Sequence, residues 1–393
     1  MAGTVLAAGA RTPIGKLSGG LSSFSAAQLG GFAIAEALKR AGITGDQVDM
    51  VIMGHVIEAG AGQITARQAA VAGGIPMSVP ATTVNKVCLS GLNAIYLADL
   101  MINAGEADII VAGGMESMTQ APYLLPGARA GYRLGDNKVI DSMMFDGLTC
   151  AFDNCAMGLG TDRYNQKLGV SRERQDQFAA GSHAKAAAAI ASGKMAEEIV
   201  VVQVPQRKGD PILFSTDEGV RVETDFASLQ GLRPAFDKEG TITAGNASQI
   251  SDGGAAMVIM SKKKADELGI RGLGELLAYG EVAGPDASLL TQPSRAIQKA
   301  LAKTDLSIAD IDLFELNEAF AAVGLASADE LGISEDKINV NGGAIALGHP
   351  LGMSGTRVAL TALYELQRRG GGTAAVALCG GGGQGDAAIL RTR

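Results

Sequence analysis

The chain has few of the residues that mark disulfide-stabilised, metal-binding or nucleic-acid-binding proteins. Its 393 residues include four cysteines and three histidines, and its formal net charge is −8 at pH 7. Four cysteines in a chain of this length do not predict a disulfide framework, so we expect a reducing compartment, the cytoplasm. An acidic balance without a long basic run gives no electrostatic support for nucleic-acid binding. The sequence therefore points away from nucleic acid as a partner.

Long hydrophobic runs are also missing. No apolar stretch is long enough to span a bilayer, which excludes a membrane-spanning helix. The N-terminal residues 5–10 read as a strand rather than as a basic region followed by an apolar core, so we expect no signal peptide. With 47% hydrophobic and 19% charged residues, the chain is expected to fold into two or three domains or one duplicated unit.

Helical and strand-like patterns alternate in the first part of the chain. Residues 26–40 predict a helix, residues 48–53 a strand and residues 108–114 a buried strand with a glycine exit. The 54 glycines show no repeat period and sit at strand ends, which is typical of tight α/β turns. We expect an α/β fold with a mostly parallel sheet covered by helices.

The same order of elements returns about 263 positions later. Ala33-Ile34 matches Ala296-Ile297 at an offset of 263, and Ser90-Gly91 before one helix matches Ser354-Gly355 before another. A repeat of this length predicts two domains of like topology. Because ligands bind beyond the carboxyl ends of parallel strands, loops from both halves are expected to meet in one cleft.

Residues 115–250 lack this alternation. They are rich in Met, Asp, Gly and Pro and contain one helical stretch, residues 172–192. Residues 251–262 read as a strand that returns the chain to the sheet. We interpret the segment as a long excursion from the first half, a lid or substrate-binding region.

Cys88 lies in the stretch Asn-Lys-Val-Cys-Leu-Ser-Gly-Leu-Asn, between an apolar segment and a helical pattern. We expect it on a tight turn, with Ser90 as helix cap and Gly91 allowing close backbone approach. Unpaired backbone N–H groups and the helix dipole would favour the thiolate, which is the nucleophilic form. The alternative is a buried cysteine serving as a small hydrophobic residue.

The three histidines differ in their surroundings. His183 lies in the expected helix 172–192 and is predicted to be a surface residue, and His55 follows a strand as a core or loop histidine. His349 lies in Asn-Gly-Gly-Ala-Ile-Ala-Leu-Gly-His-Pro, an irregular loop that Pro350 restrains. Such a histidine is suited to accept a proton from a thiol or to donate a hydrogen bond to an oxyanion.

Two further residues stand at strand ends in the second half. Cys379 opens a glycine-rich run after strand 374–378, and no GK[ST] follows, so a P-loop is not expected. The run supplies backbone N–H groups beside a thiol, as an oxyanion hole requires. Asn317 follows strand 311–316, where a helix N-cap is the alternative role. Cys150 and Cys155 have the wrong spacing for a metal site and no histidine cluster, so we interpret them as structural.

These motifs together resemble the thiolases. The resemblance rests on Asn-Lys-Val-Cys-Leu-Ser-Gly-Leu around Cys88, Asn-Glu-Ala-Phe-Ala around Asn317, Gly-Gly-Ala-Ile-Ala-Leu-Gly-His-Pro around His349 and Leu-Cys-Gly-Gly-Gly around Cys379. It covers essentially the whole chain and includes Gly-Asn-Ala-Ser-Gln-Ile-Ser-Asp-Gly from position 245. Within the family, the chain is most similar to the bacterial acetyl-CoA acetyltransferases.

The resemblance implies two duplicated βαβαβαββ halves in five layers (αβαβα) with an inserted loop domain. On this basis we expect an N-terminal half at 1–118 and 250–272, a loop domain at 119–249 and a C-terminal half at 273–393. It also implies a homotetramer, no prosthetic group and no metal, with coenzyme A and acyl-CoA as substrates. The reaction implied is the reversible Claisen condensation of two acetyl-CoA molecules to acetoacetyl-CoA and coenzyme A.

The resemblance also implies the roles of individual residues. Cys88 would carry the acetyl group, His349 would activate it, and Cys379 would act as general base on the second acetyl-CoA. His349 with a water held by Asn317 would form one oxyanion hole, and the N–H groups of Cys88 and Gly381 the other. The coenzyme A contacts implied are Leu148, Met157, Arg221, Ser228, Ala244, Ser248, Ala319 and Phe320. Ala156 departs from the pattern, because many acetoacetyl-CoA thiolases have histidine at that position.

Four hypotheses follow from the sequence. The first is a short-chain thiolase, and the second is a degradative 3-ketoacyl-CoA thiolase for longer chains, with the same catalytic residues. The third is a ketosynthase-like condensing enzyme, against which Cys379 argues. The fourth is a non-catalytic protein that binds coenzyme A, which the intact set of catalytic residues makes improbable. Chain length, physiological direction and pathway (fatty acid metabolism among them) stay open.

Overall fold

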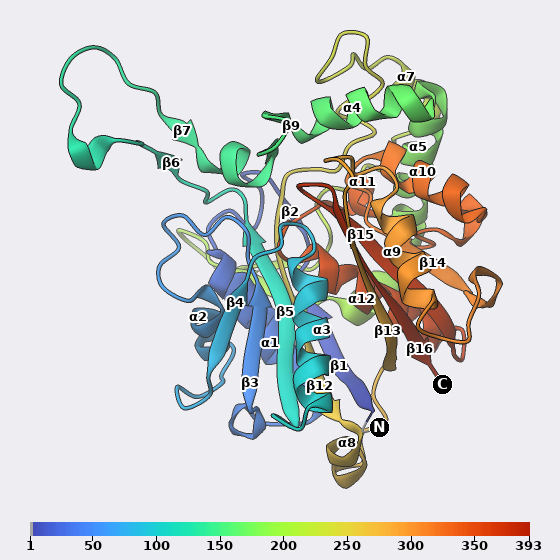
Figure 1. The fold of residues 1–393 in the computed structure, drawn as a ribbon. Coiled ribbons are helices and arrows are strands. Elements are labelled where there is room, and N and C mark those ends of the chain that lie inside the picture. The colour runs from blue at the N-terminus through green and yellow to red at the C-terminus, as the bar shows by residue number, and fades with distance from the viewer. Residues whose placement is uncertain (1–2) are drawn as a thin grey trace.

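The computed structural model describes residues 3–393 and has two β-sheets at its centre (Figure 1). The first sheet has the strand order β1-β12-β5-β3-β4, with β2 added to β12, and the second has the order β13-β16-β15-β14. The strands of the first sheet are β1 (Thr4–Arg11), β2 (Gly15–Lys16), β3 (Met50–Gly54), β4 (Ala81–Val84), β5 (Ile109–Ser117) and β12 (Ser251–Ser261). Those of the second are β13 (Glu275–Ala283), β14 (Leu313–Leu316), β15 (Gly372–Gly380) and β16 (Gln384–Thr392).

Within residues 3–393 each central sheet has one strand that runs against the others, β12 or β16, so the expectation of mostly parallel sheets is confirmed in strand direction. Strand β3 runs parallel to β4 and β5, whereas β12 runs antiparallel to β1 and β5. In the second sheet β14 and β15 are parallel, and β16 is antiparallel to both its neighbours. The reason is local for β15 and β16: only residues 381–383 join them, too few for the crossover that parallel strands need.

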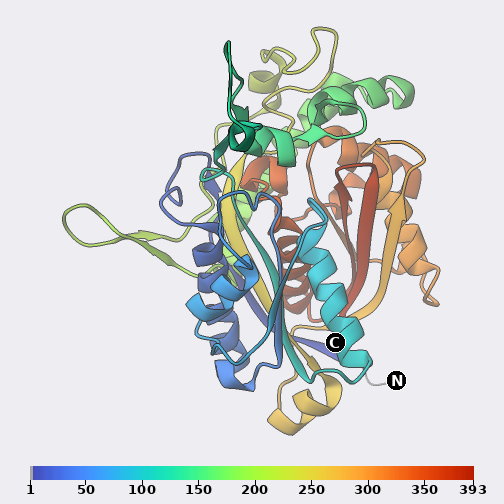
Figure 2. The ribbon, with the colours of Figure 1, turned by 60° about the vertical axis from the view of Figure 1, so that its left-hand side comes forward.

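The helices form three layers around the two sheets (Figures 1 and 2). They are α1 (Ala26–Ala41), α2 (Thr65–Ala72), α3 (Ser90–Asn103), α8 (Lys262–Leu268), α9 (Gln292–Leu301), α10 (Ala321–Leu331), α11 (Ala344–Leu347) and α12 (Ser354–Arg368). Helices α3 and α12 share one apolar core with the facing sides of both sheets, through residues such as Ile95 and Leu360. Helices α1 and α2 cover the other face of the first sheet, and α9 and α10 that of the second. The five αβαβα layers are confirmed.

The internal repeat is also confirmed in three dimensions. Helix α1 corresponds to α9, β3 to β14, α3 to α12 and β5 to β15, in the same order along the chain. Strand β4 is the exception, because in the second half only Ile338 forms a single parallel bridge to Phe314. Helix α1 begins at a capping box of Ser25 and Gln28 and ends at Gly42, whose φ of 68° suits glycine.

The excursion between β5 and β12 combines two longer helices, α4 and α5, with short helices and strands. They are β6 (Tyr123–Leu124), β7 (Ile140–Asp141), β8 (Thr149–Cys150), β9 (Cys155–Ala156), α4 (Met157–Leu168), α5 (Arg172–Ala191), α6 (Lys194–Glu198), β10 (Val202–Val204), β11 (Ile212–Phe214) and α7 (Phe226–Gln230). Helix α5 is the one expected at 172–192. Figure 1 shows the arm of β6 and β7 projecting from the body of the molecule. The domain limits at 118, 249 and 272 stay a prediction.

His183 is buried, so its predicted surface position was wrong. Helix α5 contacts α7, α10 and α11, and these contacts leave the His183 side chain in the interior. Its Nδ1 accepts a hydrogen bond of 3.1 Å from the backbone N–H of Arg221. Burial lowers the pKa of His183 to about 4, and the charge of Arg221 adds to the effect. The neutral ring therefore serves as an acceptor for the loop after β11.

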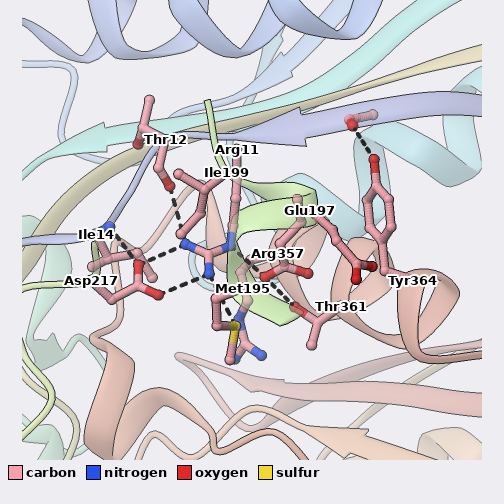
Figure 3. Close-up of polar contacts among 12 residues, drawn as sticks. Arg11, Thr12, Ile14, Met195, Glu197, Ile199, Asp217, Arg357, Thr361 and Tyr364 are labelled. Atoms are coloured by element: carbon pink, nitrogen blue, oxygen red, sulfur yellow. Dashed lines mark hydrogen bonds and ion pairs between the residues drawn. The ribbon is translucent and has the colours of Figure 1, made fainter. Parts of the chain in front are cut away.

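A buried cluster of charges joins β1 to the excursion (Figure 3). Arg11 is fully buried, and its guanidinium lies 2.6 Å from Glu198 and 2.7 Å from Asp217. Thr361 of α12 donates to the same Glu198 carboxylate at 3.1 Å. Removing one partner of a buried ion pair is costly, because it leaves the other group buried without its partner. The cluster therefore fixes α6 and the loop at Asp217 against the first half.

Replacing Arg11 by Leu should lower the free energy of unfolding by about 3–5 kcal/mol, because it leaves two buried carboxylates unpaired. Arg174 provides the control, since it also pairs with two carboxylates, Asp329 and Glu335, but lies at the surface. The Arg174→Leu change should cost about 1 kcal/mol or less. Urea unfolding of the three proteins measures both values, and equal losses would contradict the role of the buried cluster.

Candidate active site

Cys88 lies on the turn between β4 and α3, as expected from the sequence. The residue before it, Val87, has a φ of 52°, in the left-handed region that β-branched residues rarely adopt. Asn85 Oδ1 accepts the Val87 N–H at 3.0 Å and helps to hold this conformation. Backbone strain of this kind is often found at functional sites, where the surrounding structure imposes it.

Ser90 does not cap α3, so that part of the prediction was wrong. Leu89 is the N-cap residue, and no side chain caps the helix. The Ser90 hydroxyl instead accepts the Lys86 N–H at 2.8 Å and donates to the Val87 carbonyl at 2.6 Å. The serine hydroxyl thus stabilises the turn before the helix and does not bind the first N–H groups of the helix.

Lys86 anchors the same turn to the second half of the molecule. Its Nζ lies 2.8 Å from Asp386, a fully buried residue of β16, and also pairs with Glu281 of β13. A charge pair with one buried partner is costly to break. The turn that carries Cys88 is therefore fixed from both halves.

Glycines allow the loop that carries His349 to pack close to the turn that carries Cys88. A Cβ on Gly91 would lie 2.8 Å from the Gly352 carbonyl oxygen, and one on Gly114 would lie 1.9 Å from the same atom. No side chain fits at either position, so the loop can pack directly on α3 and β5. At the other side, a Cβ on Gly380 would lie 2.6 Å from Leu89 Cγ, which brings the end of β15 against the Cys88 turn.

Glu116 of β5 fixes the loops beneath the site. Its carboxylate accepts backbone N–H groups from Val56 at 3.2 Å, Ile57 at 3.1 Å and Gly352 at 2.9 Å. His55 Nε2 lies 3.3 Å from the same carboxylate. His55 is buried, so it belongs to this structural network, one of the roles expected for it.

The three expected catalytic side chains line one cavity. Cys88, His349 and Cys379 surround a space of about 60 Å³ together with Gly381. The backbone N–H groups of Cys88 and Gly381 act on the Cys88 sulfur and oppose the rise of its pKa that burial causes. Asn317 Nδ2 lies 3.3 Å from His349 Nε2, and Phe320, not Asn317, is the N-cap residue of α10. The structure thus brings all five residues to one place.

The expectation that Cys88 favours the thiolate was wrong. Burial raises the pKa of Cys88 to about 12, with a further contribution from the charge of Glu116, although the N–H groups of Cys88 and Gly381 oppose the rise. Burial also raises the pKa of Cys379, and the nearby Cys88 adds to it. Desolvation outweighs the donors and the helix dipole here.

His349 is held in its neutral form. Burial lowers the pKa of His349 to about 3, and the positive charge of Arg357 acts in the same direction. Arg357 itself pairs with Glu315 at 3.0 Å. The site therefore contains two protonated thiols and a neutral imidazole, and any charge in it must develop during a reaction.

Five of the eight residues expected to contact coenzyme A line this cavity. They are Leu148, Met157, Ser248, Ala319 and Phe320. Arg221, Ser228 and Ala244 are exposed and do not line it. Ala156 immediately precedes Met157, at the junction of β9 and α4.

Sequence reasoning missed four residues of the lining. Val87, Gly147, Leu289 and Leu351 also face the cavity. Val87, Leu351 and Gly147 adjoin the Cys88 motif, the His349 motif and Leu148, so nearness in sequence was a usable signal for them. Leu289 carried none. A second cavity of about 550 Å³ shares Val87, Gly147, Met157 and Gly381 with the first.

Other kinds of site were sought in residues 3–393. In this range no group of three or more His, Cys, Asp or Glu side chains is placed to hold a metal ion. No helix of the same range is long and apolar enough to cross a membrane. Cys150 and Cys155 stand opposite each other in the β8–β9 ladder, and both are free thiols.

Comparison with known proteins gives a consistent result. The family model for the thiolase N-terminal domain matches residues 4–263, and that for the C-terminal domain matches residues 270–392. A probable acetyl-CoA acetyltransferase of Mycolicibacterium smegmatis is 56% identical over 98% of this chain and 100% of its own. Acetyl-CoA acetyltransferases of Cupriavidus necator and Pseudomonas aeruginosa are 49% and 47% identical, over 100% and 99% of both chains.

The raised pKa of Cys88 predicts how its reactivity depends on pH. Without substrate, the rate of alkylation by iodoacetamide should rise about tenfold per pH unit from pH 7 to 10, because the thiolate fraction grows at that rate below the pKa. Mass spectrometry of the peptide that contains Cys88 separates this reaction from those at Cys150 and Cys155. A rate that levels off below pH 9 would contradict the buried, protonated thiol.

Proposed function

We infer, since the chain belongs to the thiolase family, that it is an acetyl-CoA C-acetyltransferase. The reaction condenses two acetyl-CoA molecules to acetoacetyl-CoA and coenzyme A, and it is reversible. Relatives that carry this name are 47–56% identical over nearly the whole chain. The observation that carries the proposal is the meeting of Cys88, His349 and Cys379 around one small cavity.

The size of the cavity favours an acetyl group over a long acyl chain. It measures about 60 Å³, and apolar side chains such as Leu148, Leu289 and Leu351 line it. One water molecule needs roughly 10–15 Å³ of cavity volume on this measure, so the space suits a group of a few atoms. The degradative thiolase with longer substrates is therefore the less favoured alternative.

In the first half-reaction, Cys88 attacks the thioester carbonyl of acetyl-CoA. Its thiol proton passes to His349 Nε2, since a thiol with a raised pKa needs a nearby base. We propose that the N–H groups of Cys88 and Gly381 receive the negative charge that develops on the carbonyl oxygen. Coenzyme A leaves as a thiolate, and we propose that the Cys379 thiol supplies its proton.

In the second half-reaction, the Cys379 thiolate removes a proton from the methyl group of a second acetyl-CoA. We propose that His349, with a water held by Asn317, forms the oxyanion hole for the resulting enolate; His349 Nε2 and Asn317 Nδ2 lie 3.3 Å apart. The enolate carbon attacks acetyl-Cys88, whose sulfur leaves and regains its proton from His349. Each oxyanion-hole donor is worth roughly 3 kcal/mol of transition-state stabilisation.

The wider site is proposed to hold coenzyme A without a prosthetic group. The apolar side chains of Leu148, Met157 and Phe320 suit the pantetheine arm and exclude water. Arg221 lies exposed, where a guanidinium can pair with phosphate or stack on adenine. We place Ser228, Ala244, Ser248 and Ala319 in the same binding region.

We also propose a cytoplasmic homotetramer. Free thiols at all four cysteines suit a reducing compartment. Large exposed apolar side chains cluster on and beside the arm of β6 and β7, among them Tyr123, Leu125, Leu134 and Val139. Such patches are typical of surfaces that contact another subunit.

Replacing Cys88 by Ala should abolish formation of the acetyl-enzyme and lower turnover by about 10³-fold or more. Replacing Cys379 by Ser should slow condensation and thiolysis by about 10²–10⁴-fold, the range expected for loss of a general base. Acetylation of Cys88 should be much less affected in the second variant. Intact-protein mass spectrometry measures the acetyl-enzyme, and release or uptake of coenzyme A measures turnover.

Cys155→Ser is the matched control, because this thiol does not line the cavity. It should keep ordinary activity in all three assays. Ordinary turnover in Cys88→Ala would disprove the nucleophile, and equal losses of acetylation, condensation and thiolysis in Cys379→Ser would disprove the base.

A further inference from the structure

Ser354, the first residue of α12, is in direct contact with His349. We propose that Ser354 is a positioning residue that fixes the tautomer of His349, keeping the ring proton on Nδ1 and the Nε2 lone pair toward the cavity. This inference rests on the function proposed above, in which His349 Nε2 receives the Cys88 proton.

The hydroxyl of Ser354 has two partners. Its Oγ lies 2.6 Å from His349 Nδ1 and 2.9 Å from the carbonyl oxygen of Pro350, four residues earlier. Serines in helices commonly donate to the carbonyl four residues before them. A hydroxyl has a single hydrogen, so donation to Pro350 leaves only lone pairs for the ring. The contact at Nδ1 is then an N–H donating to Ser354.

The other side of the ring faces Asn317. Its Nδ2 lies 3.3 Å from His349 Nε2, and its Oδ1 has no hydrogen-bond partner. This orientation of the amide requires a lone pair on Nε2, whereas the reversed amide would require an N–H there, so the contacts of Ser354 decide the tautomer. The ring is buried and neutral, so it carries one proton, and the two contacts of Ser354 place that proton on Nδ1.

The corresponding serine in the first half has the same arrangement of hydrogen bonds, and there the group that donates to its hydroxyl is known. Ser90 is the counterpart of Ser354, and its hydroxyl donates to the Val87 carbonyl three residues earlier. It accepts from the backbone N–H of Lys86, a group that can only donate. The hydroxyl of each serine therefore donates to the carbonyl of a residue three or four positions earlier. It accepts a hydrogen bond from an N–H group of the loop before the helix.

The assignment matters for the chemistry. With the proton on Nδ1, Nε2 carries the lone pair that can accept the proton of Cys88 in place of the contact with Asn317, and the imidazolium that forms keeps an acceptor at Ser354. The other tautomer would direct an N–H at the cavity and leave the thiol without a base. In serine proteases an aspartate accepts the Nδ1–H of the catalytic histidine and fixes its tautomer in the same way.

The tautomer can be observed directly, because the chain has only three histidines. Magic-angle-spinning ¹⁵N spectra of histidine-labelled protein distinguish protonated from unprotonated ring nitrogens. His349→Asn removes one pair of signals and so assigns them. We expect a protonated Nδ1 and an unprotonated Nε2 in the substrate-free protein, and a protonated Nε2 would overturn the proposal.

Kinetics test the consequence. Ser354→Ala should slow acetylation of Cys88 about 10–100-fold, the usual loss when the partner of a functional histidine is removed. Ser354→Thr, which keeps the hydroxyl, should restore most of the rate. In a His349→Asn background the Ser354→Ala change should alter the rate less than twofold, because the serine acts through the ring.

The control is Thr392→Val, which deletes another buried hydroxyl of the second half, bonded to the Leu273 carbonyl at the end of the β15–β16 ladder opposite to Gly380. It should leave acetylation unchanged. Equal slowing by Ser354→Ala with and without His349 would show a merely structural role and overturn the proposal. If the wild-type protein never acetylates Cys88, the proposed function is wrong. The ¹⁵N spectra test the tautomer of His349 independently of that result.

Discussion

The contact on which the site depends is the close packing of α3 against α12 between the two sheets. A Cβ on Gly355 would lie 2.3 Å from the backbone nitrogen of Leu92, and one on Gly91 would lie 2.8 Å from the Gly352 carbonyl. Because neither glycine has a side chain, the N-termini of the two helices touch. The loops that precede these helices carry Cys88 and His349, so each half of the duplicated chain brings one of the proposed reacting groups to the same cavity.

Burial then decides the electrostatics of the site. Once the loops have packed together, both thiols and the imidazole lose water, and each is held in its neutral form. A charge that develops there is stabilised by fixed donors rather than by solvent, which is the arrangement that gives preorganised sites their effect. The loops can be held this tightly because charges outside the cavity anchor them: Lys86 on Asp386, and Glu116 on three backbone N–H groups.

Much of this arrangement could be predicted from the sequence, because it depends on local patterns and on the repeat. The turn at Cys88 and the pairing of α3 with α12 follow from spacing and from the two Ser-Gly pairs. The pKa of Cys88 could not be predicted, since it depends on how much water the second half excludes. The burial of His183 depends on helices that follow it far along the chain. Ser90 was predicted to cap the helix that it begins. Its hydroxyl instead bonds to Lys86 and Val87 of the preceding turn, whose conformation, with Val87 at positive φ, the sequence pattern does not reveal.

The central claim is that this chain joins and cleaves two-carbon units at Cys88, in a cavity sized for an acetyl group. The most direct test compares kcat/KM for cleavage by coenzyme A of acetoacetyl-CoA and of a long-chain 3-ketoacyl-CoA. We expect kcat/KM to be about tenfold or more higher for acetoacetyl-CoA. The cavity measures about 60 Å³, so a longer acyl chain would have to displace the apolar side chains that line it. Equal or faster cleavage of the long-chain substrate would contradict it and identify a degradative thiolase instead.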